Sequence, residues 1–135
     1  MPAKVRTVLE AAPLATPLKQ RVVTSPLVEL DFVEVEVIHK AFAPMVRQQA
    51  YDLGELAIVS CLQAVAYDRP IVMLPIVVAS RFQRGCLIAY RPRRVPAPED
   101  LAGKRIGVRS YTQTTGMWVR AHLKEDYGLA TPSIH

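Results

Sequence analysis

The chain has 135 residues and is 50% hydrophobic and 21% charged, which excludes a disordered chain and suffices for one domain with its own core. Its 17 basic and 12 acidic residues give a net charge of +5, and every apolar run is broken by a charge or a proline before the roughly 20 residues that a membrane-spanning helix needs. The composition therefore predicts a cored domain without a membrane span.

The first part of the chain is typical of strands alternating with helices. Residues 4–9 are rich in β-branched side chains, and residues 28–37 alternate apolar with acidic side chains, so both segments predict strands. Apolar residues at helical spacing predict an amphipathic helix over 39–51, ended by Gly54. The nearly continuous apolar run at 55–60 then predicts a strand that is covered on both faces.

The alternation continues into the middle of the chain. Residues 61–67 have the composition of a helix, which Pro70 ends. Two more apolar runs, 71–78 and 85–91, predict strands, the first at a sheet edge or with a bulge because of Pro75. Strands that alternate with helices predict an α/β layered fold with a parallel sheet.

A different pattern follows residue 91. Residues 91–98 are basic and rich in proline, as expected of a semi-rigid connector. Residues 99–103 predict one helical turn that ends at a glycine, and residues 104–109 predict a further strand. Residues 114–127 predict a helix closed by Gly128, and its inner face is expected at Val119, Leu123 and Tyr127.

The basic residues are concentrated between Arg81 and Arg109, a segment that contains eight basic and two acidic residues. Such a segment is compatible with nucleic acid, an anionic membrane surface, a small anion, or simply a solvated loop. Neither a zinc-finger spacing, a helix-turn-helix signature nor aromatics alternating with the basic residues is present, so a nucleic-acid partner is not expected.

The cysteines and histidines do not predict a metal site or a cofactor. Cys61 and Cys86 lie far apart in apolar surroundings and are interpreted as buried free thiols. The three histidines are scattered, which favours structural or surface roles. The basic start of the chain is interrupted by Glu10, Pro13 and Pro17, so no export signal is predicted.

The segment between the last predicted strand and the last helix is the strongest candidate for a ligand site. It is polar throughout, and a helix start offers free backbone N–H groups that favour an anion. An ordinary threonine cap is the simpler alternative, although one cap does not need five consecutive polar residues. The candidate residues are Tyr111, Thr112, Gln113, Thr114, Thr115 and Gly116.

Two further places could contact a ligand. Arg81, Phe82 and Gln83 lie between two predicted strands, where an arginine could bind a carboxylate in bidentate fashion, or the segment is a surface hairpin with solvated arginines. Glu55 stands at the start of an apolar run and is either a buried acid or a polar strand end. The sequence does not predict a catalytic role for any of these residues.

Residues 51–129, and more loosely residues 4–50, resemble type II periplasmic-binding-protein-like proteins. The string P-E-D-L-A-G-K-R-I-G-V at 98–108 is fairly specific for this superfamily. The string Y-T-Q-T-T-G at 111–116 is more specific for the branch of ABC-transporter substrate-binding proteins that groups with dihydroxyphthalate decarboxylase. The resemblance implies two α/β lobes joined by a hinge, with ligand between them.

The resemblance also implies where the lobes divide. Residues 1–95 would be most of lobe one, and residues 96–135 would be the crossover and the first strand and helix of lobe two. Because family proteins are more than twice this length, the rest of lobe two and the return segment of lobe one would be missing. A second chain or self-association is therefore a possible partner that completes the fold.

The sequence departs from the decarboxylase pattern in three places. Residues 10–14 read E-A-A-P-L where those enzymes have an Asp-Tyr-Asp loop, and residues 81–84 read R-F-Q-R where they tend to have Arg-Phe-Arg-His. Residues 54–56 keep only the acid of a Ser-Glu-Met motif. Decarboxylation needs an electron sink or a metal for the carbanion, and the sequence offers no residue for that task.

These departures favour binding over catalysis. The sequence-based hypothesis is a solute-binding protein, a component of an ABC transporter, that holds a small anionic, carboxylated ligand between Arg81–Gln83 on one lobe and Thr112–Gly116 on the other. An ABC permease is the partner that this hypothesis implies. The alternative is a 4,5-dihydroxyphthalate decarboxylase-like carboxy-lyase. Localisation stays open: cytoplasmic by the absence of a visible signal, periplasmic or extracellular by the resemblance.

Overall fold

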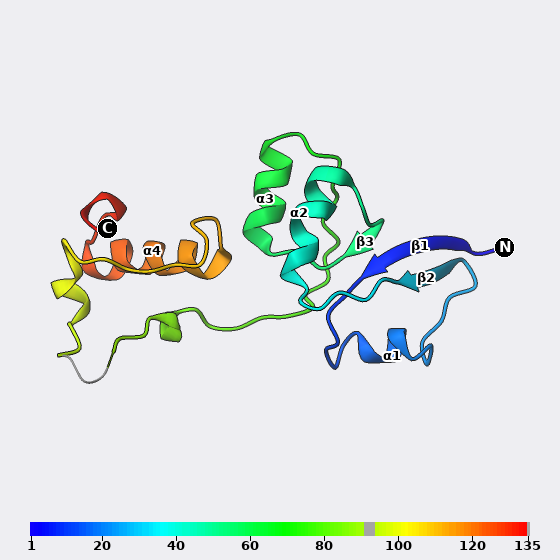
Figure 1. The fold of residues 1–135 in the computed structure, drawn as a ribbon, viewed down its shortest axis with the longest axis horizontal. Coiled ribbons are helices and arrows are strands. Elements are labelled where there is room, and N and C mark those ends of the chain that lie inside the picture. The colour runs from blue at the N-terminus through cyan, green and yellow to red at the C-terminus, as the bar shows by residue number, and fades with distance from the viewer. Residues whose placement is uncertain (91–93, 135) are drawn as a thin grey trace. The chain divides into compact units, whose positions relative to one another are not determined.

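The computed structural model describes residues 1–90 and 94–134 (Figure 1). The chain forms two compact units, residues 1–79 and residues 80–135. None of the helices in the described part is long and apolar enough to cross a membrane. The first unit has mixed α/β structure, as predicted, whereas the second contains helices and extended segments.

A three-stranded parallel sheet organises the first unit. Its strands are β1 (Ala3–Val8), β2 (Val28–Phe32) and β3 (Leu53–Gly54), in the order β2-β1-β3. Val5 is opposite Leu30, and Thr7 is opposite Leu53, so β1 pairs with both neighbours in the same direction. Because all three strands are parallel, their carboxyl ends lie along one edge of the sheet.

Helices connect these strands. α1 (Thr16–Lys19) lies between β1 and β2 in the chain, α2 (His39–Gln48) lies between β2 and β3, and α3 (Ile58–Ala66) follows β3. In Figure 1, α2 and α1 lie on opposite sides of the paired β1 and β2 arrows. Helical crossovers of this kind are what parallel strands require.

The core of the first unit forms where α2 packs against the central strand. Val8 on β1 is fully buried and contacts side chains of α2 and the residue before it. Burial of these apolar side chains is the main force that holds α2 on the sheet. The buried cluster consists of Val8, Ile38, Ala41 and Met45, with Val35, Phe42, Tyr51 and Leu56 packed against it.

The second unit is built around one long helix, α4 (Thr114–Tyr127). Gly128 ends this helix in the left-handed conformation, with φ of 67°, and its amide donates to the Lys124 carbonyl at 3.0 Å. Three short 3₁₀ turns complete the unit: η1 (Arg84–Cys86), η2 (Pro98–Leu101) and η3 (Thr131–Ser133). η1 and η2 both contact α4.

Several sequence-based predictions are confirmed. The strand at 4–9 is β1, the helix at 39–51 contains α2, and the helix at 114–127 is α4. The helix at 61–67 is the second half of α3, and the turn at 99–103 overlaps η2. The strand at 28–37 is half as long as predicted, because β2 ends at Phe32.

Four predicted strands are wrong within the described residues. The second half of the run at 55–60 belongs to α3 and the first half to no element, since a short apolar run does not distinguish a strand from a buried helix. Residues 71–78, the described part of 85–91 and residues 104–109 are not in strands. Arg91 lies outside the described residues. Apolar composition alone does not make a strand, because each strand also needs a ladder partner for its backbone groups.

Two smaller predictions also need correction. α2 ends at Gln49, whose φ of 48° stops the helix, and Gly54 lies in β3 instead. On α4, Leu123 is buried as expected, but Tyr127 is exposed. Cys61 is buried and Cys86 half-buried, and both are free thiols.

Replacing Gly54 by alanine is expected to destabilise the first unit by about 1–3 kcal/mol, which is the usual cost of overpacking. A Cβ at position 54 would lie 2.8 Å from the Val8 carbonyl oxygen and would collide with the end of the Met45 side chain. Gly85→Ala is the matched control, because a Cβ at position 85 meets no atom within 4 Å. Urea unfolding should show a loss for Gly54→Ala and little change for Gly85→Ala; equal effects would contradict the packing argument.

The outer face of α3 predicts self-association. Ile58, Leu62 and Val65 lie one helical turn apart and are 49%, 54% and 55% exposed, so they form an apolar stripe. Leu62→Glu should therefore reduce the mass of the purified protein measured by light scattering, whereas Gln63→Glu adds the same charge away from the stripe and should not. A wild-type protein that is monomeric at high concentration would contradict this prediction.

Candidate functional site

A glutamate follows each strand of the parallel sheet. Glu10 comes shortly after β1, Glu34 shortly after β2, and Glu55 directly after β3. The carboxyl ends of parallel strands meet at one edge, so the three side chains are delivered to the same side of the first unit. This edge is where ligands usually bind in open α/β sheets.

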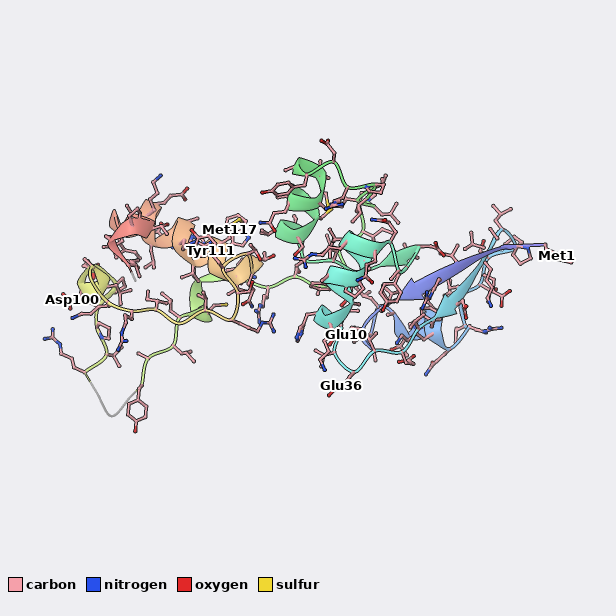
Figure 2. All side chains as sticks on the ribbon, turned by 45° about the horizontal axis from the view of Figure 1, so that its top comes forward. Met1, Glu10, Glu36, Asp100, Tyr111 and Met117 are labelled. Atoms are coloured by element: carbon pink, nitrogen blue, oxygen red, sulfur yellow. The ribbon has the colours of Figure 1, made fainter. Side chains whose placement is uncertain are left out.

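A hollow of about 210 Å³ opens at this edge. Figure 2 shows two of its lining residues, Glu10 and Glu36, together on one side of the first unit, away from Met1 at the start of β1. Three carboxylates and one ammonium group give the hollow a strongly polar character. Its lining is formed by Leu9, Glu10, Ala11, Lys19, Glu34, Val35, Glu36 and Ile38.

Lys19, the last residue of α1, supplies the positive charge of this lining. Its ammonium nitrogen is 3.3 Å from Oε1 of Glu34 and 5.9 Å from the centre of the Phe32 ring. Only 17% of the Lys19 side chain is exposed, whereas 80% of the Glu34 side chain is. The stem of Lys19 is thus covered by protein while its charge remains at the sheet edge.

Glu55 is the group whose protonation the site alters. Burial raises the pKa of Glu55 above its usual value, and the negative charge of Glu10 raises this pKa further. A hydrogen bond from the backbone of Glu10 and the positive charge of Lys19 lower the pKa, but they do not cancel the increase. The Glu55 backbone is fixed by its amide, which donates to the Val8 carbonyl at 3.3 Å.

The carboxylates at the sheet edge do not form a metal centre. Within residues 1–90 and 94–134, no group of three or more His, Cys, Asp or Glu side chains is arranged to hold a metal ion. What the arrangement offers instead is a half-buried carboxyl group, Glu55, beside a second carboxylate and an ammonium group. A carboxyl group with a raised pKa keeps its proton to higher pH and is suited to proton transfer.

The other sequence-predicted site residues all lie in the second unit. Arg81 donates from Nη2 to Oγ1 of Thr115 at 3.1 Å, so the two predicted ligand segments touch each other directly. Both segments lie within residues 80–135, and their assignment to two lobes stays a prediction. Their contact with a ligand stays a prediction.

The loop before α4 is held by side chains as well as backbone. Ser110 and Thr112 share a hydrogen bond of 3.2 Å between their hydroxyls, and Gln113 precedes the helix without a side-chain cap. Arg120 lies over the Tyr111 ring, 4.1 Å from its centre, and donates to the Tyr111 carbonyl at 3.0 Å. Arg120 thus holds the loop onto α4, which the sequence did not predict.

The remaining predicted residues have different environments. Phe82 is almost fully exposed, whereas Gly116 is buried in α4. Gln83 donates to the Arg81 carbonyl at 3.3 Å and thereby stabilises its own loop. Thr114 is the first residue of α4. Arg84 forms a two-pronged ion pair with Asp126, which ties η1 to α4.

A second hollow, of about 230 Å³, lies against α4. Its lining is mostly apolar and comes from the extended segment at 106–108, from α4 and from the end of the chain. Tyr111, Gly116 and Arg120 also contribute to it. Because apolar side chains such as Leu123 form both this lining and the small core of the second unit, the hollow is part of that core.

Sequence reasoning missed most of the sheet-edge site. Only Glu55 was named as a candidate, and Lys19 lies in a helix of four residues that no periodic pattern indicates. A usable signal was present for Glu10, which directly follows the strand predicted at 4–9. Glu55, in contrast, begins the strand predicted at 55–60, so that prediction placed it at the opposite edge. Residues at the carboxyl ends of parallel strands are expected to lie together.

Two known proteins are similar in sequence to most of this chain. The chain is 33% identical over 100 residues to a 4,5-dihydroxyphthalate decarboxylase of Comamonas testosteroni. It is 32% identical over 100 residues to a 4,5-dihydroxyphthalate decarboxylase of Pseudomonas putida. The chain is a distant homologue of 4,5-dihydroxyphthalate decarboxylase.

The homology covers most of this chain but a minority of each relative. The matched residues are 73% of the chain, and they span 29% of the Comamonas decarboxylase and 37% of the Pseudomonas decarboxylase. No protein-family model matches the chain.

The homology contradicts the hypothesis of a solute-binding protein of an ABC transporter. Both relatives bear the name of a decarboxylase, not of a solute-binding protein of an ABC transporter. The alternative hypothesis, a decarboxylase-like carboxy-lyase, is therefore favoured over the main one. The departures from the decarboxylase pattern at 10–14, 54–56 and 81–84 therefore do not exclude this homology, and the permease partner depended on the overturned role.

The raised pKa of Glu55 predicts a pH-dependent effect of Glu55→Gln on stability. Ionising Glu55 costs the folded protein more than the unfolded chain, so the wild type loses stability as pH rises through the folded-state pKa of this group. Glutamine keeps the acceptor for the Glu10 backbone but never ionises. The free energy of unfolding of Glu55→Gln, relative to wild type, should therefore increase from acidic to neutral pH.

Urea unfolding at acidic and neutral pH measures this difference. Glu29→Gln is the matched control, since it removes the same charge from an exposed side chain of β2. A relative stability of Glu55→Gln that stays constant with pH, or falls as pH rises, would contradict the burial of Glu55.

Proposed function

We propose that this chain is part of a carboxy-lyase that removes carbon dioxide from a hydroxylated aromatic carboxylate, with 4,5-dihydroxyphthalate as the first substrate to test. The observation that carries the proposal is the homology over 100 residues to two decarboxylases named for that compound. The mixed α/β structure of the first unit is compatible with it.

The sequence offers no residue to stabilise a carbanion, but the structure of 4,5-dihydroxyphthalate removes the need for one. In 4,5-dihydroxyphthalate each carboxylate has a ring hydroxyl para to it, as the name states. Such a hydroxyl can push electron density to the ring carbon that carries the carboxylate. The ring carbon then accepts a proton before CO2 leaves, so a free carbanion does not form and the protein needs a proton donor more than an electron sink.

The sheet-edge hollow has the groups that this reaction needs. Its carboxyl groups can exchange protons, and Lys19 places an ammonium group where a substrate carboxylate would meet positive charge. Leu9, Val35 and Ile38 add apolar surface for a ring. In this proposal the hollow at the carboxyl ends of the strands is the active site to which this chain contributes.

We also propose the finer fold assignment that the resemblance implies. Residues 1–95 would form most of the first lobe of a type II periplasmic-binding-protein-like fold, and residues 96–135 would begin the second. The exposed apolar stripe on α3 supports the proposal that a second copy or another chain packs against the first unit.

Incubation of the purified protein with 4,5-dihydroxyphthalate tests the function. Release of CO2 is expected, together with a single aromatic product that retains one carboxylate. Phthalate, which lacks both hydroxyls, is the matched control and should release none. Absence of CO2 from the hydroxylated compound, or equal release from both, would contradict the proposal.

A further inference from the structure

The sheet-edge hollow contains several carboxyl groups, and their environments differ. Glu34 and Glu36 have side chains that are 80% and 79% exposed, and each is close to a lysine, Lys19 and Lys40 respectively. Both side chains therefore lie in surface ion pairs. Glu55 is only partly exposed and lies beside another carboxylate, Glu10.

We propose that Glu55 is the catalytic acid, which delivers a proton to the ring carbon that carries the departing carboxylate. This inference deepens the proposed function and rests on it. Glu55 does not itself line the hollow, but its carboxyl group accepts a hydrogen bond from the backbone of Glu10, which does. It also lies directly after β3, where its amide donates to the Val8 carbonyl and fixes its backbone at the ligand-binding edge.

The proposed step is balanced without any redox partner. The O–H bond of the Glu55 carboxyl group breaks, and its proton forms a new C–H bond at the ring carbon. The bond between that carbon and the carboxylate then breaks, its electron pair returns to the ring, and CO2 leaves. Glu55 is left as a carboxylate, and a proton from water restores it for the next turnover.

The surroundings of Glu55 suit this cycle. Burial and the negative charge of Glu10 both raise its pKa, so Glu55 keeps its proton to higher pH than an exposed glutamate does. Lys19 and the Glu10 backbone hydrogen bond act in the opposite direction, so the carboxylate left after proton transfer is also stabilised. A group that donates and regains a proton in each turnover needs a pKa near the working pH.

The same reasoning defines the substrate class. A proton enters an aromatic ring carbon readily only when a hydroxyl group para or ortho to that carbon donates electron density. We therefore expect aromatic acids with such a hydroxyl to be substrates, and isomers with a single hydroxyl meta to the carboxylate to be unreactive. The hydroxyl pattern, more than the number of carboxylates, would then set the specificity of the reaction.

The test compares CO2 release from 4,5-dihydroxyphthalate by wild type, Glu55→Gln, Glu55→Asp and Glu29→Gln over a range of pH. Loss of a positioned general acid should lower kcat of Glu55→Gln by about 10²- to 10⁴-fold. Glu55→Asp keeps a carboxyl group and should retain part of the activity. Glu29 lies on β2, where its side chain is near Arg21, so Glu29→Gln should match the wild type.

The wild type also supplies a test that needs no variant. Its kcat/KM should fall as pH rises, with an apparent pKa equal to that of the Glu55 carboxyl measured by NMR titration of the free protein. Agreement of the two values and a fold of Glu55→Gln that matches wild type by circular dichroism support the inference.

The possible failures are distinguishable. An active wild type whose Glu55→Gln variant keeps full kcat and the same pH profile overturns the role of Glu55 but leaves the proposed function standing. An active wild type whose kinetic pKa differs from that of Glu55 overturns the role in the same way. A wild type that releases no CO2 overturns the proposed function and this inference together.

Discussion

The parallel direction of three short strands is the constraint on which the proposed site depends. Glu10, Glu34 and Glu55 are far apart in the sequence, and they share an edge only because β1, β2 and β3 all run the same way. An antiparallel neighbour would deliver its last residue to the opposite edge. The close approach of Gly54 to Val8 keeps the two-residue β3 in register, and with it the carboxyl group of Glu55.

Negative and positive side chains at this edge shift the pKa of Glu55 in opposite directions. Two nearby carboxylates, Glu10 and Glu55, favour protonation of the more buried one, whereas Lys19 favours the ionised forms. Without Lys19, the edge would repel any carboxylate substrate. Without Glu10, Glu55 would lose its proton at lower pH. In the proposed reaction, this combination would admit an acidic substrate and supply an acid that protonates it.

Part of each unit follows from the sequence, because β-branched runs and helical spacing identify β1 and α2 in the first unit and α4 in the second. The failures have physical causes. The run at 55–60 is apolar on every side, and α3 is indeed a helix with apolar residues both buried and exposed, so periodicity carries no information there. Lys19 and Arg120 were missed because their contacts, with Glu34 and Tyr111, join segments that no local pattern connects.

Solvent exposure affects both the stability of the first unit and the pKa of Glu55. Val72, Ile76 and Val77 are largely exposed although their composition is that of a buried segment. An apolar surface of this kind gains free energy when protein covers it. Protein packed over the sheet edge would also remove water from Glu55, which disfavours its charged form and raises its pKa further. Burial of the sheet edge would therefore strengthen Glu55 as the proposed proton donor.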